Sequence, residues 1–334
     1  RGLTIRPAVR PRLLFGATDV PVLRARAAAR PGLLERLRTE TRALTATPGA
    51  QLNTLQPYMS GSEGLKVAQA YVLTGDPSLV PWVKARVQAL LAMETWFSPV
   101  HVGGCRVCDH VMANVAAEVV QMHDLLGAAY TLEETLGVVK SLRRLHFDPF
   151  LEGTGEKPEW WFRTESMSNW TIMTCGETGL AMCGFAEHFP EANEVLARAA
   201  DGVIRLLNTL PPEGDFTEGV GYWFATLRFG LQYGRALRRL SGGAIDLFTH
   251  PVLRVTGDLQ GSFAYSATIN GTPLASGKAA DVSTLNPVIG TTDLAALNTD
   301  YGNALRILRE AGPGRLYYRA YLQLDTPVEN AVAL

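Results

Sequence analysis

The pattern of hydrophobic and polar positions predicts a chain built from consecutive amphipathic helices. Apolar residues recur every three or four positions, and capping or turn residues bound each run. One such run places Val80, Val83, Val87 and Leu90 on a single stripe after Ser78. The pattern predicts helices over residues 20–26, 31–44, 64–73, 78–91, 111–126, 131–142, 168–189, 190–207 and 222–240.

The helical pattern weakens towards the carboxyl end. Glycine and proline divide residues 251–290 into short pieces, a further helix is expected over 303–309, and 316–324 fits either a helix or a strand. Alternating, strand-like patterns are scarce throughout. We therefore expect one all-α domain over residues 1–334, with its core at about 10–260. Periodicity alone leaves an α-solenoid, an orthogonal bundle and a closed α/α toroid open.

Composition narrows the class of protein. The chain is 47% hydrophobic and 19% charged, which excludes a disordered chain. No apolar run reaches the roughly 20 residues that span a bilayer, so we expect no membrane segment. A net charge of -1 argues against a nucleic-acid partner. The chain begins at Arg1 without a methionine or an apolar leader, as expected for a processed or trimmed product.

The cysteines offer only weak signs of a metal site. His101, Cys105, Cys108 and His110 place four possible ligands within ten positions, whereas zinc sites draw ligand pairs from separated segments. Free thiols are favoured there, with a local disulfide and zinc as the alternatives. We therefore expect no metal and no cofactor. Cys175 and Cys183 fall about 12 Å apart on one predicted helix and are expected to be buried thiols.

Four stretches of sequence resemble one superfamily of enzymes. They are Arg10-Pro11-Arg12-Leu13-Leu14-Phe15, Tyr71-Val72-Leu73-Thr74-Gly75-Asp76-Pro77, Ser168-Asn169-Trp170 and Gly214-Asp215-Phe216-Thr217-Glu218-Gly219-Val220-Gly221-Tyr222-Trp223. Their order and spacing over residues 10–260 are similar to those of the α/α-toroid polysaccharide lyases of the heparinase II/III and alginate-lyase type. The resemblance implies an incomplete barrel of antiparallel helix hairpins with few or no strands. It also implies a secreted or periplasmic protein.

The sequence departs from this family in two respects. Many of the lyases carry a histidine directly after the asparagine, where this chain has Trp170. Many also continue into a β-sandwich domain, whereas this sequence ends too soon to contain one, so we expect either a toroid-only form or a remainder outside this sequence. The role of the histidine must therefore be absent or supplied from elsewhere in the chain.

The activity implied by the resemblance is β-elimination on a uronic-acid-containing polysaccharide. A base removes the C5 proton beside the carboxylate, and an acid protonates the leaving oxygen at C4. Asn169 is expected to neutralise the carboxylate and Tyr222 to transfer protons. A tyrosine acting as base needs a nearby positive charge, for which Arg228 and Arg163 are candidates.

Further residues are expected to contact the substrate. Glu218 is predicted to orient Tyr222 or to bind sugar hydroxyls, and His110 to act as an auxiliary base or carboxylate contact. Indole rings pack against sugar faces, which points to a binding wall for the group, although core packing is the better explanation for any single tryptophan. The tryptophans of this wall are Trp160, Trp161, Trp170 and Trp223.

Three alternatives to a lyase remain at this stage. A toroid glycoside hydrolase would use two carboxylates from Glu165, Glu177, Asp215 and Glu218. A uronate epimerase would share the proton abstraction at C5 but leave the polymer intact. A helical domain that binds carbohydrate without catalysis is the third. The expected partner is an acidic polysaccharide or oligosaccharide in each case, and the oligomeric state stays open.

Overall fold

Helices make up nearly all of the regular structure in the computed structural model. It describes residues 9–164, 168–212, 214, 216, 220–256, 267–269 and 272–274, without the side chains of residues 220, 221, 223–226, 267–269 and 272–274. The α-helices are α1 (Val20–Ala28), α2 (Pro31–Thr45), α3 (Pro57–Thr74), α4 (Leu79–Leu91), α5 (His110–Leu126), α6 (Leu132–Leu142), α7 (Asp148–Gly153), α8 (Asn169–Phe185), α9 (Ala192–Thr209) and α10 (Val220–Leu240). Strands β1 (Ala267–Ile269) and β2 (Thr272–Leu274) pair as a short antiparallel hairpin. The expected all-α class is confirmed.

Two predicted helix boundaries were wrong. The third helix begins at Pro57 rather than Gly64, because a proline suits the first helical position and the following small residues face a neighbouring helix. The helix predicted over 168–189 ends at Phe185 and continues only as a short 3-10 turn. The helix expected over 303–309 and the segment 316–324, expected as a helix or a strand, lie outside the described residues.

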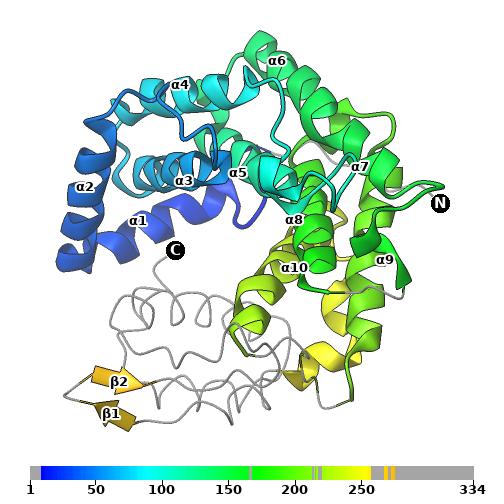
Figure 1. Ribbon diagram of the computed structural model, residues 1–334. Coiled ribbons are helices and arrows are strands. Elements are labelled where there is room, and N and C mark those ends of the chain that lie inside the picture. The colour runs from blue at the N-terminus through cyan, green and yellow to red at the C-terminus, as the bar shows by residue number, and fades with distance from the viewer. Residues whose placement is uncertain are drawn as a thin grey trace.

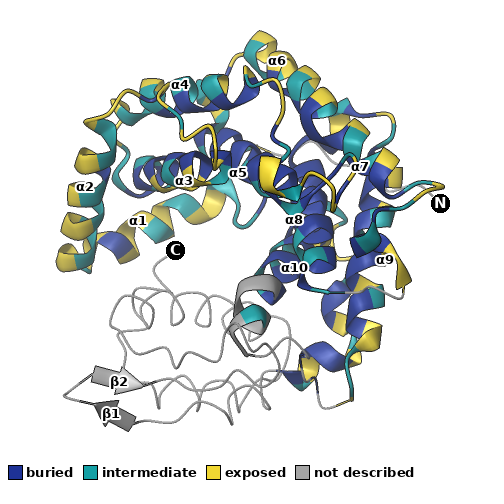
Figure 2. Cartoon of the chain, in the orientation of Figure 1, coloured by how far each residue is buried: buried dark blue, intermediate teal, exposed yellow. Residues whose placement is uncertain are grey.

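Four helices lie side by side through the middle of the molecule, and we call α3, α5, α8 and α10 the inner row (Figure 1). Each packs against the next along this row. Helix α4 covers α3 and α5, and α9 covers α8, on the outer side (Figure 1). Burial follows this layering, since the inner row is buried while the outer helices expose one face (Figure 2).

Helices α8 and α10 run in the same direction. A Cβ atom added to Gly176 would lie 2.7 Å from the carbonyl carbon of Phe229, and one added to Gly179 would lie 2.5 Å from the Tyr233 ring. The residue numbers of the contacting positions increase together along both helices, which indicates parallel packing. The two amino-terminal ends therefore lie at the same end of the pair.

The rest of the inner row shows the same order. The paired positions are Gly61 with Glu118 and Gly64 with Met122 between α3 and α5, and Asn114 with Glu177 and Val120 with Gly184 between α5 and α8. All four inner helices are therefore parallel. Their amino-terminal ends gather on one side of the molecule, which we call the amino-terminal end of the row.

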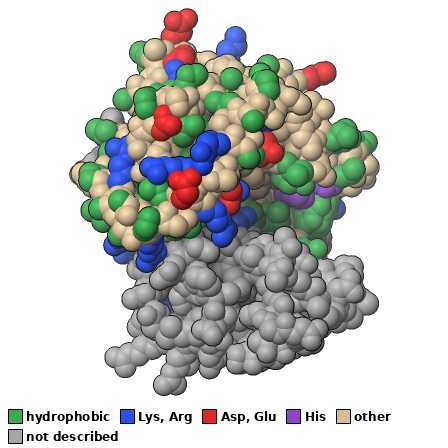
Figure 3. Space-filling model, turned by 90° about the vertical axis from the view of Figure 1, so that its left-hand side faces the viewer, with side chains coloured by type: hydrophobic (Ala, Val, Ile, Leu, Met, Phe, Trp, Pro, Cys, Tyr) green, Lys and Arg blue, Asp and Glu red, His purple; other side chains and the backbone are tan. Residues whose placement is uncertain are grey.

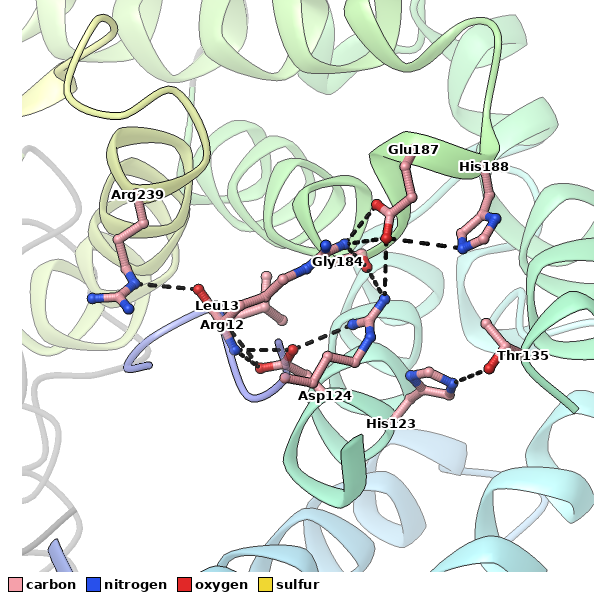
Figure 4. A network of polar contacts seen from close by, with 10 residues as sticks. Arg12, Leu13, His123, Asp124, Thr135, Gly184, Glu187, His188 and Arg239 are labelled. Atoms are coloured by element: carbon pink, nitrogen blue, oxygen red, sulfur yellow. Dashed lines mark hydrogen bonds and ion pairs between the residues drawn. The ribbon is translucent and has the colours of Figure 1, made fainter. Parts of the chain in front are cut away.

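The opposite, carboxyl-terminal end of the row is held by the first described segment of the chain (Figure 4). Asp124 near the end of α5 accepts the backbone N–H groups of Arg12 at 2.9 Å and Leu13 at 3.1 Å. The guanidinium of Arg12 donates to the carbonyl of Gly184 on α8 at 2.8 Å, and Arg239 on α10 donates to the Arg12 carbonyl at 3.2 Å. One segment thus ties three of the inner helices together.

The outer surface carries charges of both signs. On the face that includes α1 and α2, basic and acidic side chains are interspersed (Figure 3). Ion pairs such as Arg42 with Glu35 at 2.7 Å and Lys66 with Glu40 at 3.1 Å join them. Among the helices described, none is long and apolar enough to cross a membrane.

The close approach of α8 and α10 can be tested with two glycines. Gly176→Ala should lower the free energy of unfolding by about 1–3 kcal/mol, because the added methyl group meets the backbone of α10. The exposed helical Gly137, where an added Cβ meets nothing within 4 Å, is the matched control. Gly137→Ala should raise stability by about 0.5–1 kcal/mol. Equal effects of the two substitutions in denaturant titrations would contradict the packing.

Candidate active site

The amino-terminal end of the inner row brings together several of the predicted site residues. His110 is the first residue of α5, and Asn169 and Trp170 are the first two of α8. Tyr222 lies in the first turn of α10. Because these helices are parallel, all four residues belong to the same end of the row.

Tyr222 also lies on the side of α10 that faces α8. Phe229 and Gly230 contact α8 at Gly176, and Tyr222 precedes them by two helical turns on the same face. Asn169 lies seven residues before Gly176, so both residues sit about 10–12 Å from this contact towards the amino-terminal end. Tyr222 is half-buried and packs against the core, whereas Asn169 is buried.

Four aromatic rings meet at the start of α8. The ring of Trp170 lies 4.4 Å from that of His110, 4.7 Å from that of His101 and 5.1 Å from that of Trp160. All four residues are only half-buried. We call these four residues the aromatic cluster, and it offers the kind of surface on which a sugar ring packs.

Buried hydrogen bonds fix the segments that carry this cluster. Glu159 is 3% exposed, and its carboxylate accepts the backbone N–H groups of Arg106 and Val107, both at 2.8 Å. The indole of Trp161 donates to the Cys108 carbonyl at 3.1 Å, and Thr171 on α8 donates to the Trp161 carbonyl at 2.5 Å. The loop before α5, the segment around Trp160 and the start of α8 therefore form one unit.

His101 and Asp109 form a close pair within this unit. The Nδ1 atom of His101 lies 2.7 Å from the carboxylate of Asp109, which is fully buried and caps α5 by accepting the backbone N–H of Met112. The His101 side chain is 17% exposed. His110 differs, because burial lowers its pKa to about 4 and keeps its ring neutral near pH 7.

A polar layer lies one to two turns deeper in the row, and each inner helix contributes to it. Its members are Ser62 on α3, Asn114 and Glu118 on α5, Glu177 on α8 and Arg228 on α10. Ser62 donates to Glu118, and Asn114 donates to Glu177 at 2.6 Å.

Both carboxyl groups of this layer favour their protonated form. Burial raises the pKa of Glu118 to about 8, although the Ser62 hydrogen bond and the charge of Arg228 act in the opposite direction. Burial and the neighbouring Glu118 raise the pKa of Glu177 well above its usual value. The polar layer therefore carries less negative charge near pH 7 than two ionised glutamates would give it.

Arg228, predicted as a cation near Tyr222 and as a substrate contact, belongs to the polar layer. It lies six residues after Tyr222, about 9 Å deeper along α10, and its charge acts on Glu118 and Glu177. Its roles toward Tyr222 and the substrate stay predictions. Arg163, the other predicted cation, is exposed and donates to the Pro158 carbonyl at 3.2 Å.

The prediction that Trp161 belongs to the binding wall is corrected. Its side chain is fully buried in the core and does not face a ligand. Trp160 and Trp170 do reach the aromatic cluster. Glu218 lies outside the described residues, as does the side chain of Trp223. Of the acids proposed for a hydrolase, Glu177 is 3% exposed and does not reach solvent, while Glu165, Asp215 and Glu218 lie outside the described part of the chain.

The structure also describes the surroundings of the four cysteines. Cys105, Cys108, Cys175 and Cys183 are free and buried. Burial raises the pKa of Cys105 to about 11, so it stays a protonated thiol near neutral pH. Within the described ranges, no group of three or more His, Cys, Asp or Glu side chains is arranged to hold a metal ion.

Comparison with known proteins does not assign the chain to a family. No protein-family model matches the sequence, and no curated protein matches it. Arguments about function therefore rest on the geometry of the site and on the sequence resemblance.

Sequence reasoning missed part of the site. Asn114 and Glu118 stand four residues apart in an otherwise apolar helix, and this spacing is the signal that would have marked them as buried polar partners. His101 was considered only as a metal ligand. His101 contacts Trp170, which is far away in the sequence, so no local sequence pattern predicts this contact.

The raised pKa of Glu118 predicts a measurable dependence of stability on pH. An exposed glutamate releases its proton near pH 4.3, whereas folded Glu118 keeps its proton to about pH 8. The folded state thus binds more protons across this window, so the contribution of Glu118 to stability falls as pH rises through it. Glu118→Gln should remove that loss.

Denaturant titrations at a series of pH values check this prediction. The stability of Glu118→Gln relative to wild type should rise with pH between about 5 and 8. Glu156→Gln, in an exposed loop, is the control and should show a constant difference. A constant difference for Glu118→Gln as well would show that its carboxyl group is not protonated in the folded protein.

Proposed function

We propose that this protein is a lyase that cleaves an acidic, uronic-acid-containing polysaccharide by β-elimination. In this proposal the inner row and its outer helices belong to an α/α toroid, and the substrate binds at the amino-terminal end of the row. The observation that carries the proposal is the contact of His101 and His110 with Trp170. In this proposal these two histidines supply the role of the histidine that many of the resembling lyases carry directly after the asparagine.

The electrostatics of this end suit a carboxylate substrate. The first turns of α5, α8 and α10 place the positive ends of their helix dipoles at this end of the row. The protonated carboxyl groups of the polar layer beneath reduce repulsion of an anion. Asn169, at the first turn of α8, is the residue proposed to hydrogen-bond the uronate carboxylate and stabilise the enolate that forms.

Proton transfer is assigned to Tyr222 in this proposal. When the C5 proton leaves, its electron pair forms the C4–C5 double bond, and the C4–O bond breaks. The leaving oxygen takes a proton from an acid. The aromatic cluster would hold the sugar rings on either side of the cleaved bond. A polymer substrate fits a secreted or periplasmic protein.

A screen of uronate polymers tests the proposal. Alginate, heparin-type, chondroitin-type and plant or algal polymers are each incubated with the protein, and formation of the unsaturated uronate is followed by its ultraviolet absorbance. Tyr222→Phe should lower the rate roughly 10²–10⁴-fold, because it removes a proton-transfer group. Tyr71→Phe, on α3 outside the site, is the control and should keep the wild-type rate.

Other outcomes would identify a different function. Cleavage without a double bond would indicate a hydrolase. Exchange of the C5 proton without shortening of the polymer would indicate an epimerase. Binding without any turnover would indicate a carbohydrate-binding domain, and each of these results contradicts the lyase.

A further inference from the structure

A pocket of about 520 Å³ lies between the outer helix α9 and the segment that joins α7 to α8. Its volume falls within the range of about 300–1,000 Å³ that is typical of small-molecule sites. The joining segment lines it with Thr154 and Pro158, among others, and α9 lines it with Asp201 and Arg205. None of the lining residues belongs to the aromatic cluster, so the pocket is distinct from that cluster.

Two guanidinium groups line this pocket, and protein contacts hold both of them. Arg205 donates from Nε to the Asp201 carboxylate at 2.8 Å and from Nη1 to the Phe162 carbonyl at 3.1 Å. Its guanidinium also lies 4.4 Å from the centre of the Phe162 ring. Arg163 donates from Nε to the Pro158 carbonyl at 3.2 Å. Among the described residues, no group accepts from Nη2 of Arg205 or from either Nη atom of Arg163.

The charges of the pocket fit a ligand with a single negative charge. Two arginines, Arg163 and Arg205, and one aspartate, Asp201, line it, which gives a net charge of +1. The Asp201 side chain is 54% exposed and would repel a group of higher negative charge, such as a phosphate dianion. A carboxylate carries one charge and matches the planar geometry of a guanidinium group.

The uncharged lining groups add a preference for hydroxyl groups. The carboxylate of Asp201 accepts hydrogen bonds, and the exposed Thr164 hydroxyl both donates and accepts them. Pro158 is half-buried and offers a small apolar surface beside these polar groups. A sugar ring presents hydroxyl groups together with an apolar C–H face, so an acidic sugar satisfies all three kinds of lining group.

We propose that this pocket is a binding site for one acidic sugar unit. The sugar carboxylate pairs with Arg163 and Arg205, its hydroxyl groups bind Asp201 and Thr164, and its ring packs against Pro158. The site does not depend on the proposed lyase activity, because its residues lie outside the aromatic cluster.

Isothermal titration calorimetry of the full chain tests the site, with D-glucuronate and D-galacturonate as probes. At least one of them should bind, whereas D-glucose, which lacks the carboxylate, and acetate, which lacks the hydroxyl groups, should bind roughly 10-fold more weakly. Arg163→Gln should weaken uronate binding roughly 10-fold, because it removes a charge-assisted hydrogen bond. Arg163 is exposed, so this change leaves the core intact. Arg26→Gln, exposed on α1, is the matched control and should keep the wild-type affinity.

A further variant separates this pocket from the candidate active site. Trp170→Ala, in the aromatic cluster, should retain uronate binding. Loss of binding in Trp170→Ala with full binding in Arg163→Gln would place the ligand at the aromatic cluster and overturn the proposal. Equal affinity for acetate, or binding of neither uronate, overturns it as well. All of these outcomes are read from binding alone, so they are independent of whether any polymer is cleaved.

Discussion

The fold depends on how closely α8 can approach its neighbours. Glycine at positions 176, 179 and 184 lets a backbone or side chain of α10 or α5 occupy the space of a missing Cβ atom. Most of α8 is therefore buried on all sides, between α5, α9 and α10. These contacts fix the direction of the inner row, and with it the end at which Asn169 and Tyr222 lie. Any bulkier residue on these faces would separate the helices that assemble the candidate site.

The two ends of the inner row have opposite electrostatic surroundings. At the carboxyl-terminal end, Arg10 and Arg12 donate to the carbonyl of Gly184, so positive side chains satisfy the negative end of α8 (Figure 4). At the amino-terminal end, the half-buried rings of His101, His110, Trp160 and Trp170 lie against one another beside the first turns of α5 and α8. Between them, Glu118 and Glu177 are buried with hydrogen-bond donors from α3 and α5. Basic side chains thus meet the carboxyl-terminal end of the row, while rings and a buried carboxylate meet its amino-terminal end.

The sequence predicted the helices better than it predicted the site. Helix existence follows from apolar spacing, which is local, and the regular stripe of α4 shows this well. The start of α3 was missed because glycine reads as a helix breaker, although here Gly61 makes room for Glu118. The sequence pattern does not distinguish Trp161 from its neighbour Trp160. Trp161 is buried because its indole donates a hydrogen bond to the Cys108 carbonyl, a tertiary contact. The pairing of His101 with Trp170 depends on the parallel packing of α5 and α8, which no local pattern encodes.

The segment around Arg12 has a consequence for the order of folding. Its partners Asp124, Gly184 and Arg239 are 112, 172 and 227 residues away along the chain. Closing loops of this length costs conformational entropy before the contacts compensate for it, so such contacts form after local ones. During synthesis this segment emerges before all three partners, and the last of them emerges only with the end of α10. Nascent chains that end before α10 therefore lack this closure of the inner row.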